Sequence, residues 1–99
     1  MLDITRADEN GLQTVLVAGE CNIYSAAAFK DGLKADIDSS EHIAMDLSGV
    51  FEIDTSGVQV LILAKRECSA QNKEFKIVKM SRAVEGALEL LNLTKFFKG

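Results

Sequence analysis

The sequence lacks proline and tryptophan, and it has only two cysteines in 99 residues. Without proline, repeats or low-complexity tracts there is no sign of a linker, so one domain is expected over residues 1–99. No stretch reaches the roughly 18–20 unbroken apolar residues that a membrane span requires. The first residues also lack the basic and then apolar pattern of a secretory signal. We therefore expect a cytoplasmic protein without direct membrane insertion.

Basic residues are also scarce: 11 Lys and Arg stand against 15 Asp and Glu, a formal charge of −4. Their scattered positions argue against nucleic acid as a partner. Cys21 and Cys68 lack the spacing of a metal or redox pair, so both are expected to be free thiols. His42 is the single histidine and has no second ligand nearby, which makes a metal site or a Ser-His-Asp triad improbable. The sequence thus predicts no cofactor and no enzyme.

Hydrophobic patterning predicts four strands and three helices. The strands are expected at Leu2–Thr5, Leu12–Ala18, His42–Leu47 and Glu74–Met80. The helices are expected from an N-cap at Ser25 to about Ala35, over Val58–Ala70, and from a cap at Ser81 to Asn92. Further expectations concern the connections: a hairpin turn at Glu9-Asn10-Gly11, a strand end at Gly19-Glu20, a loop at Asp38-Ser39-Ser40, and a C-terminal Phe96-Phe97 pair that returns to the domain.

The segment Val58–Ala70 is ambiguous, because its Val, Ile and Leu residues favour a strand by propensity. It is too long for a typical strand, which favours a helix with Val58, Leu61 and Leu63 turned inward. The resulting order is β-β-α-β-α-β-α. It predicts an α/β fold with a mixed, mostly parallel four-stranded sheet covered by helices and an antiparallel first hairpin.

A polar turn, Asp54–Gly57, separates the third strand from this helix. A helix start has unpaired N–H groups and a partial positive charge, so it can hold a phosphate. The plainer interpretation is that Thr55 or Ser56 caps the helix. Asp54 is expected to hold the turn or to orient a hydroxyl, and it would alternatively help a kinase to take the hydroxyl proton. Gly57 would either admit a partner's backbone or a nucleotide, or ease the helix start.

Several segments resemble one family. Asp46–Val50 and Ile53–Val58 resemble the signature of the STAS domain, the fold of bacterial anti-sigma factor antagonists. Gly19-Glu20 resembles the Gly-Glu that follows the second strand in that family. Ala87–Leu93 followed by Phe96 resembles its closing helix and tail. The resemblance extends over nearly the whole chain. The length of the chain is similar to that of a stand-alone member of the family.

This resemblance implies a partner-switching regulator. An anti-sigma factor-like serine kinase would phosphorylate a hydroxyl of the turn, and a PP2C-type phosphatase would remove the phosphate. In the family the modified residue directly follows the Asp, which corresponds to Thr55. Ser56 is the only serine of the motif, and because such kinases more often use serine it is slightly preferred. Both hydroxyls therefore remain candidates.

The same resemblance implies that Asp54, Gly57, Glu20 and Asn22 contact the partner. Many members have an acidic residue where this chain has Asn22, so the kinase contact is expected to differ here.

A second hypothesis is a constitutive STAS-type subunit of a membrane transporter complex, in which neither hydroxyl is modified. The target stays open between an anti-sigma factor, a response-regulator phosphatase and an output protein for biofilm or motility. The oligomeric state also stays open.

Overall fold

A single mixed sheet organises the chain, and the computed structural model describes residues 1–9 and 12–98 of it. The elements in chain order are β1 (Leu2–Glu9), β2 (Leu12–Cys21), α1 (Ala26–Ser39), β3 (His42–Ile53), α2 (Thr55–Ala70), β4 (Phe75–Met80), α3 (Arg82–Leu90) and α4 (Thr94–Lys98). The hairpin turn predicted at Asn10-Gly11 lies outside the described residues.

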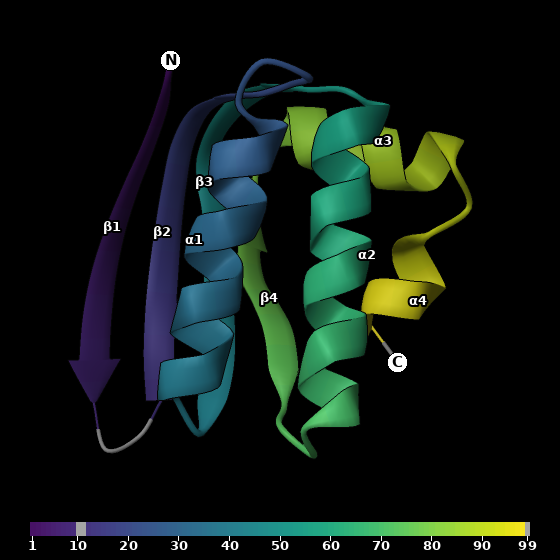
Figure 1. Ribbon diagram of the computed structural model, residues 1–99. Helices are drawn as coiled ribbons and strands as arrows, with labels where there is room; N and C mark the ends of the chain where they lie inside the picture. Colours follow the sequence, from purple (N-terminus) through teal and green to yellow (C-terminus); the bar gives the residue numbers. More distant parts are fainter. Residues whose placement is uncertain (10–11, 99) are drawn as a thin grey trace.

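The strands lie in the order β1-β2-β3-β4. The first pair is antiparallel, with Leu2 opposite Gly19. The two following pairs are parallel, as Figure 1 shows. Parallel neighbours require long crossovers, and α1 and α2 supply them. The predicted fold class is confirmed.

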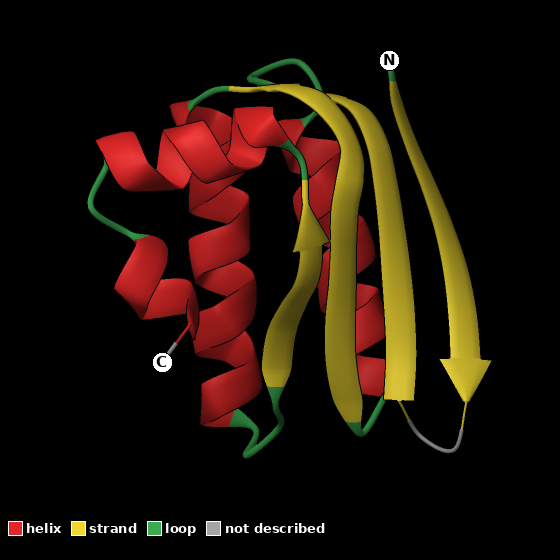
Figure 2. Ribbon diagram, turned by 180° about the vertical axis from the view of Figure 1, so that it is seen from behind, coloured by secondary structure: helices red, strands yellow, loops and turns green. Residues whose placement is uncertain are grey.

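Helices α1 and α2 pack on one face of the sheet, where the core lies (Figure 1). Strand residues alternate between the two faces, so β2 turns Val15 and Val17 into this core. Helix α1 buries Phe29, Leu33 and Ile37, which recur at helical spacing. On the other face of the sheet, no helix of the described residues lies across β1, β2 and β3 (Figure 2).

The C-terminal helices close the β4 side of the molecule. Helix α3 buries Val84 and Leu88 in the same core. Helix α4 buries Phe97, whose ring packs edge-on against Phe96 with centroids 4.9 Å apart. The predicted return of this aromatic pair onto the domain is confirmed, and Lys65 of α2 donates a hydrogen bond to the carbonyl of Phe96.

The predicted ends of the first four elements all come too early. Strand β1 continues past Thr5 to Glu9, and β3 continues past Leu47 to Ile53, because the polar and glycine residues that follow the apolar runs still pair in the sheet.

Strand β2 does not end at Gly19-Glu20 but continues to Cys21. Gly19 has φ +105°, and a Cβ there would lie 2.0 Å from the Met1 carbonyl oxygen, so the glycine bends the strand where β1 crosses close to it. Helix α1 includes Asp38 and Ser39 instead of leaving them in a loop. Polar exposed residues at a helix end gave no sign that the helix continued.

The helix α2 also differs from its prediction. It begins at Thr55, three residues before Val58, because a side chain caps it earlier than the apolar pattern starts. Val58 and Leu61 are buried as predicted, at 2% and 0% exposure. Leu63 is 46% exposed, so its predicted inward position is wrong. Leu63 lies at the groove between α1 and α2, where the two helices leave its side chain partly open to solvent.

Candidate functional site

The polar turn lies at the carboxyl-terminal edge of the two central strands. Cys21 at the end of β2 is paired with Ile53 at the end of β3. The Asp54 amide then donates to the Cys21 carbonyl at 3.0 Å, which joins the two chain segments after the strands. In parallel sheets this edge is where ligands usually bind, because loops and helix starts converge there. The loop Asn22–Ser25 and the start of α2 thus lie side by side.

Asp54 is the N-cap of α2, and its two carboxylate oxygens serve different segments. Oδ1 accepts the Gly57 amide at 3.1 Å, which satisfies one free donor of the helix start. Oδ2 accepts the Ile23 amide of the β2–α1 loop, also at 3.1 Å. Asp54 holds the turn, as expected, and the alternative that Thr55 or Ser56 caps the helix is wrong. A carboxylate has two acceptors for this purpose, and a hydroxyl has one.

Thr55 and Ser56 are therefore the first two residues of the helix. The Thr55 side chain is exposed and that of Ser56 is half-buried. Among the described residues, neither hydroxyl takes part in a hydrogen bond within the chain. Their backbone amides precede the first intrahelical donor, Val58, so they also point out of the helix start. The turn presents hydroxyls and amide donors together.

Gly57 is buried, and its missing side chain makes room for the chain itself. A Cβ at this position would lie 2.6 Å from the Cys21 carbonyl oxygen and 2.9 Å from the Ile53 side chain. The glycine therefore lets α2 approach the ends of β2 and β3. This packing within the chain is a sufficient reason for glycine here, and the approach of a partner's backbone or a nucleotide stays a prediction.

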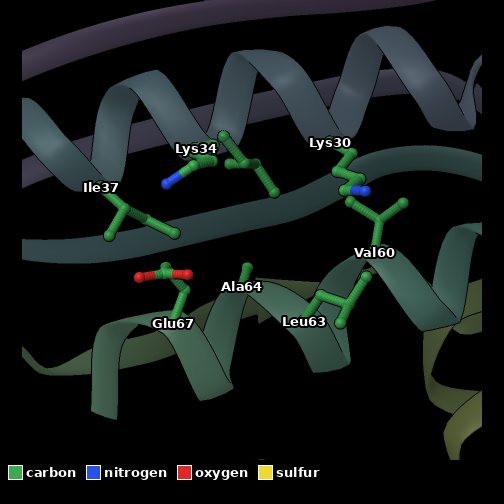
Figure 3. Close-up of a pocket in the computed structure, with 8 residues that line it drawn as sticks. Lys30, Lys34, Ile37, Val60, Leu63, Ala64 and Glu67 are labelled. Atoms are coloured by element: carbon green, nitrogen blue, oxygen red, sulfur yellow. The ribbon is translucent and has the colours of Figure 1, made fainter. Parts of the chain in front are cut away.

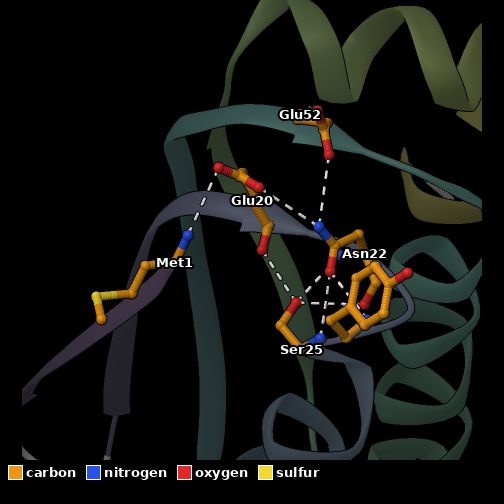
Figure 4. A network of polar contacts seen from close by, with 6 residues as sticks. Met1, Glu20, Asn22, Ser25 and Glu52 are labelled. Atoms are coloured by element: carbon orange, nitrogen blue, oxygen red, sulfur yellow. Dashed lines mark hydrogen bonds and ion pairs between the residues drawn. The ribbon is translucent and has the colours of Figure 1, made fainter.

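Glu20, Asn22 and Glu52 form a polar network next to the turn (Figure 4). Glu20 and Glu52 are paired across β2 and β3, and the Asn22 amide nitrogen lies 3.5 Å from an oxygen of each. The Asn22 side-chain oxygen accepts the Tyr24 amide at 3.0 Å and the Ser25 amide at 3.3 Å. An acidic residue here would add a third negative charge, whereas the Asn amide separates two like charges and folds the loop.

Ser25 occupies the N-cap position of α1, as predicted, but its hydroxyl does not cap the helix. It donates instead to the Glu20 carbonyl at 3.0 Å and accepts the Asn22 amide at the same distance. This serine is part of the loop that Asn22 shapes.

Three large apolar side chains at this edge are exposed to solvent: Tyr24 at 94%, Phe51 at 68% and Ile23 at 66%. Exposed aromatic residues of this kind are typical of protein contact surfaces. Sequence analysis missed them. Their signal was an apolar pair in a short loop, and a phenylalanine in the otherwise polar end of a strand.

Acidic groups surround these apolar side chains. Glu20 pairs with the N-terminal ammonium of Met1 at 3.5 Å, whereas Glu52 and Asp54 have no ion-pair partner among the residues that the structure describes. The edge is therefore apolar and negatively charged.

Other features offer less chemistry. A groove of about 150 Å³ runs between α1 and α2 and is lined mainly by aliphatic residues, with Lys30, Lys34 and Glu67 at its rims (Figure 3). Burial raises the pKa of the Cys21 thiol to about 11, with a smaller contribution from the Asp54 charge, so the thiol stays protonated. Cys68 is also a buried free thiol.

Neither a metal-binding cluster of His, Cys, Asp or Glu nor a helix long and apolar enough to cross a membrane occurs within residues 1–9 and 12–98.

Comparison with known proteins places this site in a family. The model of the family described as "Mlab, STAS domain" matches residues 4–98. The chain is 26% identical to the anti-sigma-F factor antagonist RsfB of Mycobacterium tuberculosis over 98 residues. The matched region covers 98% of this chain and 80% of that protein.

Solved structures agree on the fold. An anti-sigma factor antagonist from Mycobacterium paratuberculosis matches with a TM-score of 0.86 and 24% identity, over 98% of this chain and 83% of that one. The Bacillus cell fate determinant SpoIIAA in its phosphorylated form matches with a TM-score of 0.74 and 14% identity, over 94% and 86% of the two chains. Because the family model spans nearly the whole sequence, this chain belongs to the STAS domain family.

Proposed function

We propose that this protein is a binding module that is switched by phosphorylation of Thr55, in a bacterial partner-switching pathway. The observation that carries the proposal is the exposed Thr55 hydroxyl at the first position of α2, directly after the capping Asp54. The relative named as an anti-sigma-F factor antagonist supports a regulatory, non-catalytic role.

Accessibility favours Thr55 over Ser56. A kinase must surround the accepting hydroxyl, and Thr55 is exposed whereas Ser56 is half-buried. Both hydroxyls lie next to free amides, so a phosphate on either would gain hydrogen bonds at the positive end of the helix. The slight preference for Ser56 that rested on its being a serine is therefore reversed in this proposal.

The phosphate would act on a partner more than on the fold. A phosphoryl group adds about −1.5 to −2 charges. It would join Glu20, Glu52 and Asp54 on an edge where the N-terminal ammonium of Met1, paired with Glu20 at 3.5 Å, is the cation found among the described residues. A partner that covers Ile23 and Tyr24 would then have to desolvate the added charge, which opposes binding unless it is paired.

The proposed partners follow from this chemistry. The unmodified edge is complementary to a partner surface with apolar pockets and basic side chains. The proposed partner with such a surface is an anti-sigma factor-like serine kinase. A PP2C-type phosphatase would restore binding by removing the phosphate.

Peptide mapping of the protein from its native cells tests the proposal. We expect a species heavier by one phosphoryl group, with the modification on Thr55. The Thr55→Val variant should lose it, whereas the matched Ser56→Ala variant should keep it. Modification of Ser56 alone would reassign the site. If no phosphorylated form occurs under several growth conditions, the switch is wrong, and the constitutive subunit of a transporter complex becomes the better account.

A further inference from the structure

The second face of the sheet is uncovered, and it is not part of the site above. Figure 2 shows this open face, the side of the sheet that turns away from α1 and α2. A shallow hollow on it is lined by residues of three strands, among them Asp3, Leu16 and Asp46. Register pairs Asp46 with Lys79 of β4, which places that lysine on the same side.

The open face has exposed apolar side chains on β2 and β4, and its two outer strands carry opposite charges. Leu16 is 39% exposed and Val78 is 51% exposed. Positions on the solvent-facing side of a sheet are usually polar, so these two apolar side chains depart from the usual pattern. Asp3 lies on the outer strand β1, whereas the exposed Lys76 and Lys79 lie on the opposite outer strand β4.

The one carboxylate near the centre is compensated. Asp46 accepts hydrogen bonds from the Ser48 amide at 3.0 Å and the Ser48 hydroxyl at 2.6 Å. These bonds lower its pKa, and the Lys79 charge adds to the effect. Covering such a carboxylate is less unfavourable than covering an unpaired one.

We propose that the open face binds a second copy of this chain, so that two sheets pack face to face in a symmetric dimer. A two-fold axis between the sheets and parallel to the strands reverses the strand order. It places β1 of each copy over β4 of the other. Asp3 of one copy then faces the lysine-bearing strand of its mate, twice per dimer. An axis perpendicular to the strands would instead place β1 over β1 and lose this complementarity.

The size of the open face predicts a weak dimer. Four strands about 4.8 Å apart and about eight residues at 3.3 Å cover roughly 500 Å² of sheet. This is less than the roughly 800 Å² per partner of a standard stable interface. The dimer should therefore dissociate at low concentration and at high salt, because its charged contacts lie at the rim.

The same axis has a consequence for the site at the ends of β2 and β3. Because it keeps the strand direction, both copies present Asp54 and Thr55 at the same end of the dimer. A dimeric partner would then engage both sites at once and gain avidity. The dimer itself does not depend on phosphorylation of Thr55, so either inference can fail without the other.

Sedimentation velocity on the purified chain, from micromolar to millimolar concentration, tests the proposal. We expect the average mass to rise from one chain toward two. Val78→Glu should raise the dissociation constant by roughly tenfold or more, since it puts a charge in place of an exposed apolar side chain of this face. Leu90→Glu is the matched control, because Leu90 is 84% exposed on α3, away from the open face, and it should change nothing. A chain that stays monomeric, or a dimer that Leu90→Glu disrupts instead, would overturn the proposal.

Charge reversal tests the orientation. Asp3→Lys and Lys79→Asp should each be monomeric alone, because each homodimer would carry two repulsive contacts. Mixing the two variants should restore a heterodimer, in which both contacts are attractive again. Thermal unfolding of each variant confirms that it is folded, and Lys76→Asp replaces Lys79→Asp if that variant is not. Folded variants that dimerise alone, or fail to pair when mixed, would contradict the proposed axis.

Discussion

The starts of α2 and α3 make an instructive comparison, since both are capped in the same way. Asp54 accepts the amide of Gly57, and Ser81 accepts the amide of Val84 at 3.2 Å, so each cap binds the third helical residue. The Ser81 side chain forms this one hydrogen bond among the described residues. The second oxygen of Asp54 binds Ile23 of another loop and thereby joins two loops at one edge of the sheet.

The difference teaches that a cap alone does not define a site. The start of α2 combines a two-sided cap, free hydroxyls and exposed apolar neighbours, whereas α3 has only the cap. A mutation at α2 should therefore disturb more of the molecule than the same mutation at α3, and the predictions below compare the two.

The largest expected contrast is between two glycines. Gly57→Ala should lower the free energy of unfolding by about 3 kcal/mol, because the new methyl meets the Cys21 backbone, which cannot move aside. Gly86→Ala in α3 should raise it by about 0.5–1 kcal/mol, because nothing lies within 4 Å and alanine favours helix. Urea denaturation of both variants measures the contrast. Similar effects at the two positions would show that the close approach at Gly57 is not constrained.

The two caps should differ next. Asp54→Ala removes two hydrogen bonds and should destabilise the fold by about 2 kcal/mol. Ser81→Ala removes one and should destabilise it by about 1 kcal/mol. Asp54→Ser, which keeps a single capping acceptor, should fall between them. Equal losses for Asp54→Ala and Ser81→Ala in urea denaturation would mean that the bond to Ile23 contributes nothing.

High pH should weaken the region beneath Asp54. The pKa of Cys21 is about 11 in the fold against an ordinary value of 9.0, so the native thiol keeps its proton where the unfolded thiol loses it. The unfolded chain is then favoured as pH rises through this window, by up to about 2 kcal/mol for this group. Urea denaturation at about pH 8 and about pH 10.5 should show a smaller loss for Cys21→Ala than for the natural chain. Identical losses would contradict the assignment to Cys21.

The smallest effect on stability is expected at the proposed switch itself. Thr55→Glu should change the free energy of unfolding by no more than about 0.5 kcal/mol, in the stabilising direction, because it places a negative charge at a helix N-terminus. Thr94→Glu, at the first residue of α4, provides a comparison at another helix start. A strongly destabilised Thr55→Glu variant would show that charge at this position alters the fold, which the proposal does not allow.

Periodicity and connection lengths were enough to predict the succession of strands and helices along the chain, the antiparallel first hairpin and the parallel pairing of the strands that helices connect. Those features follow from local apolar patterns, and the apolar segment of each strand and long helix was long enough to reveal its period. The end of β2 was misjudged at Gly19, because its role depends on β1 lying against it, a contact that local sequence does not contain. The predicted helix α1 was also too short. Asp38 and Ser39 are exposed and polar, so the apolar pattern that marks the helix does not include them.

The candidate site was predicted in its location but not in its internal arrangement. The role of Asp54 in holding the turn was expected, but a hydroxyl cap stayed open as an alternative, because local sequence does not contain the bond from Asp54 to a residue 31 positions away. For Gly57 the sequence left two roles open, the approach of a partner and an easier helix start, and neither includes its packing on Cys21, which is distant in sequence. The apolar pair Ile23-Tyr24 was a signal in the sequence, but its exposure depends on how the loop folds.

Site-specific photocrosslinking in the native cells tests the central claim most directly. A photoreactive phenylalanine analogue at Tyr24 should form an adduct with one protein when position 55 is threonine. The adduct should disappear in the Thr55→Glu variant and persist in Ser81→Ala, which leaves the edge unchanged. An adduct of equal yield in the Thr55→Glu variant would contradict the claim that charge at the start of α2 controls what this edge binds.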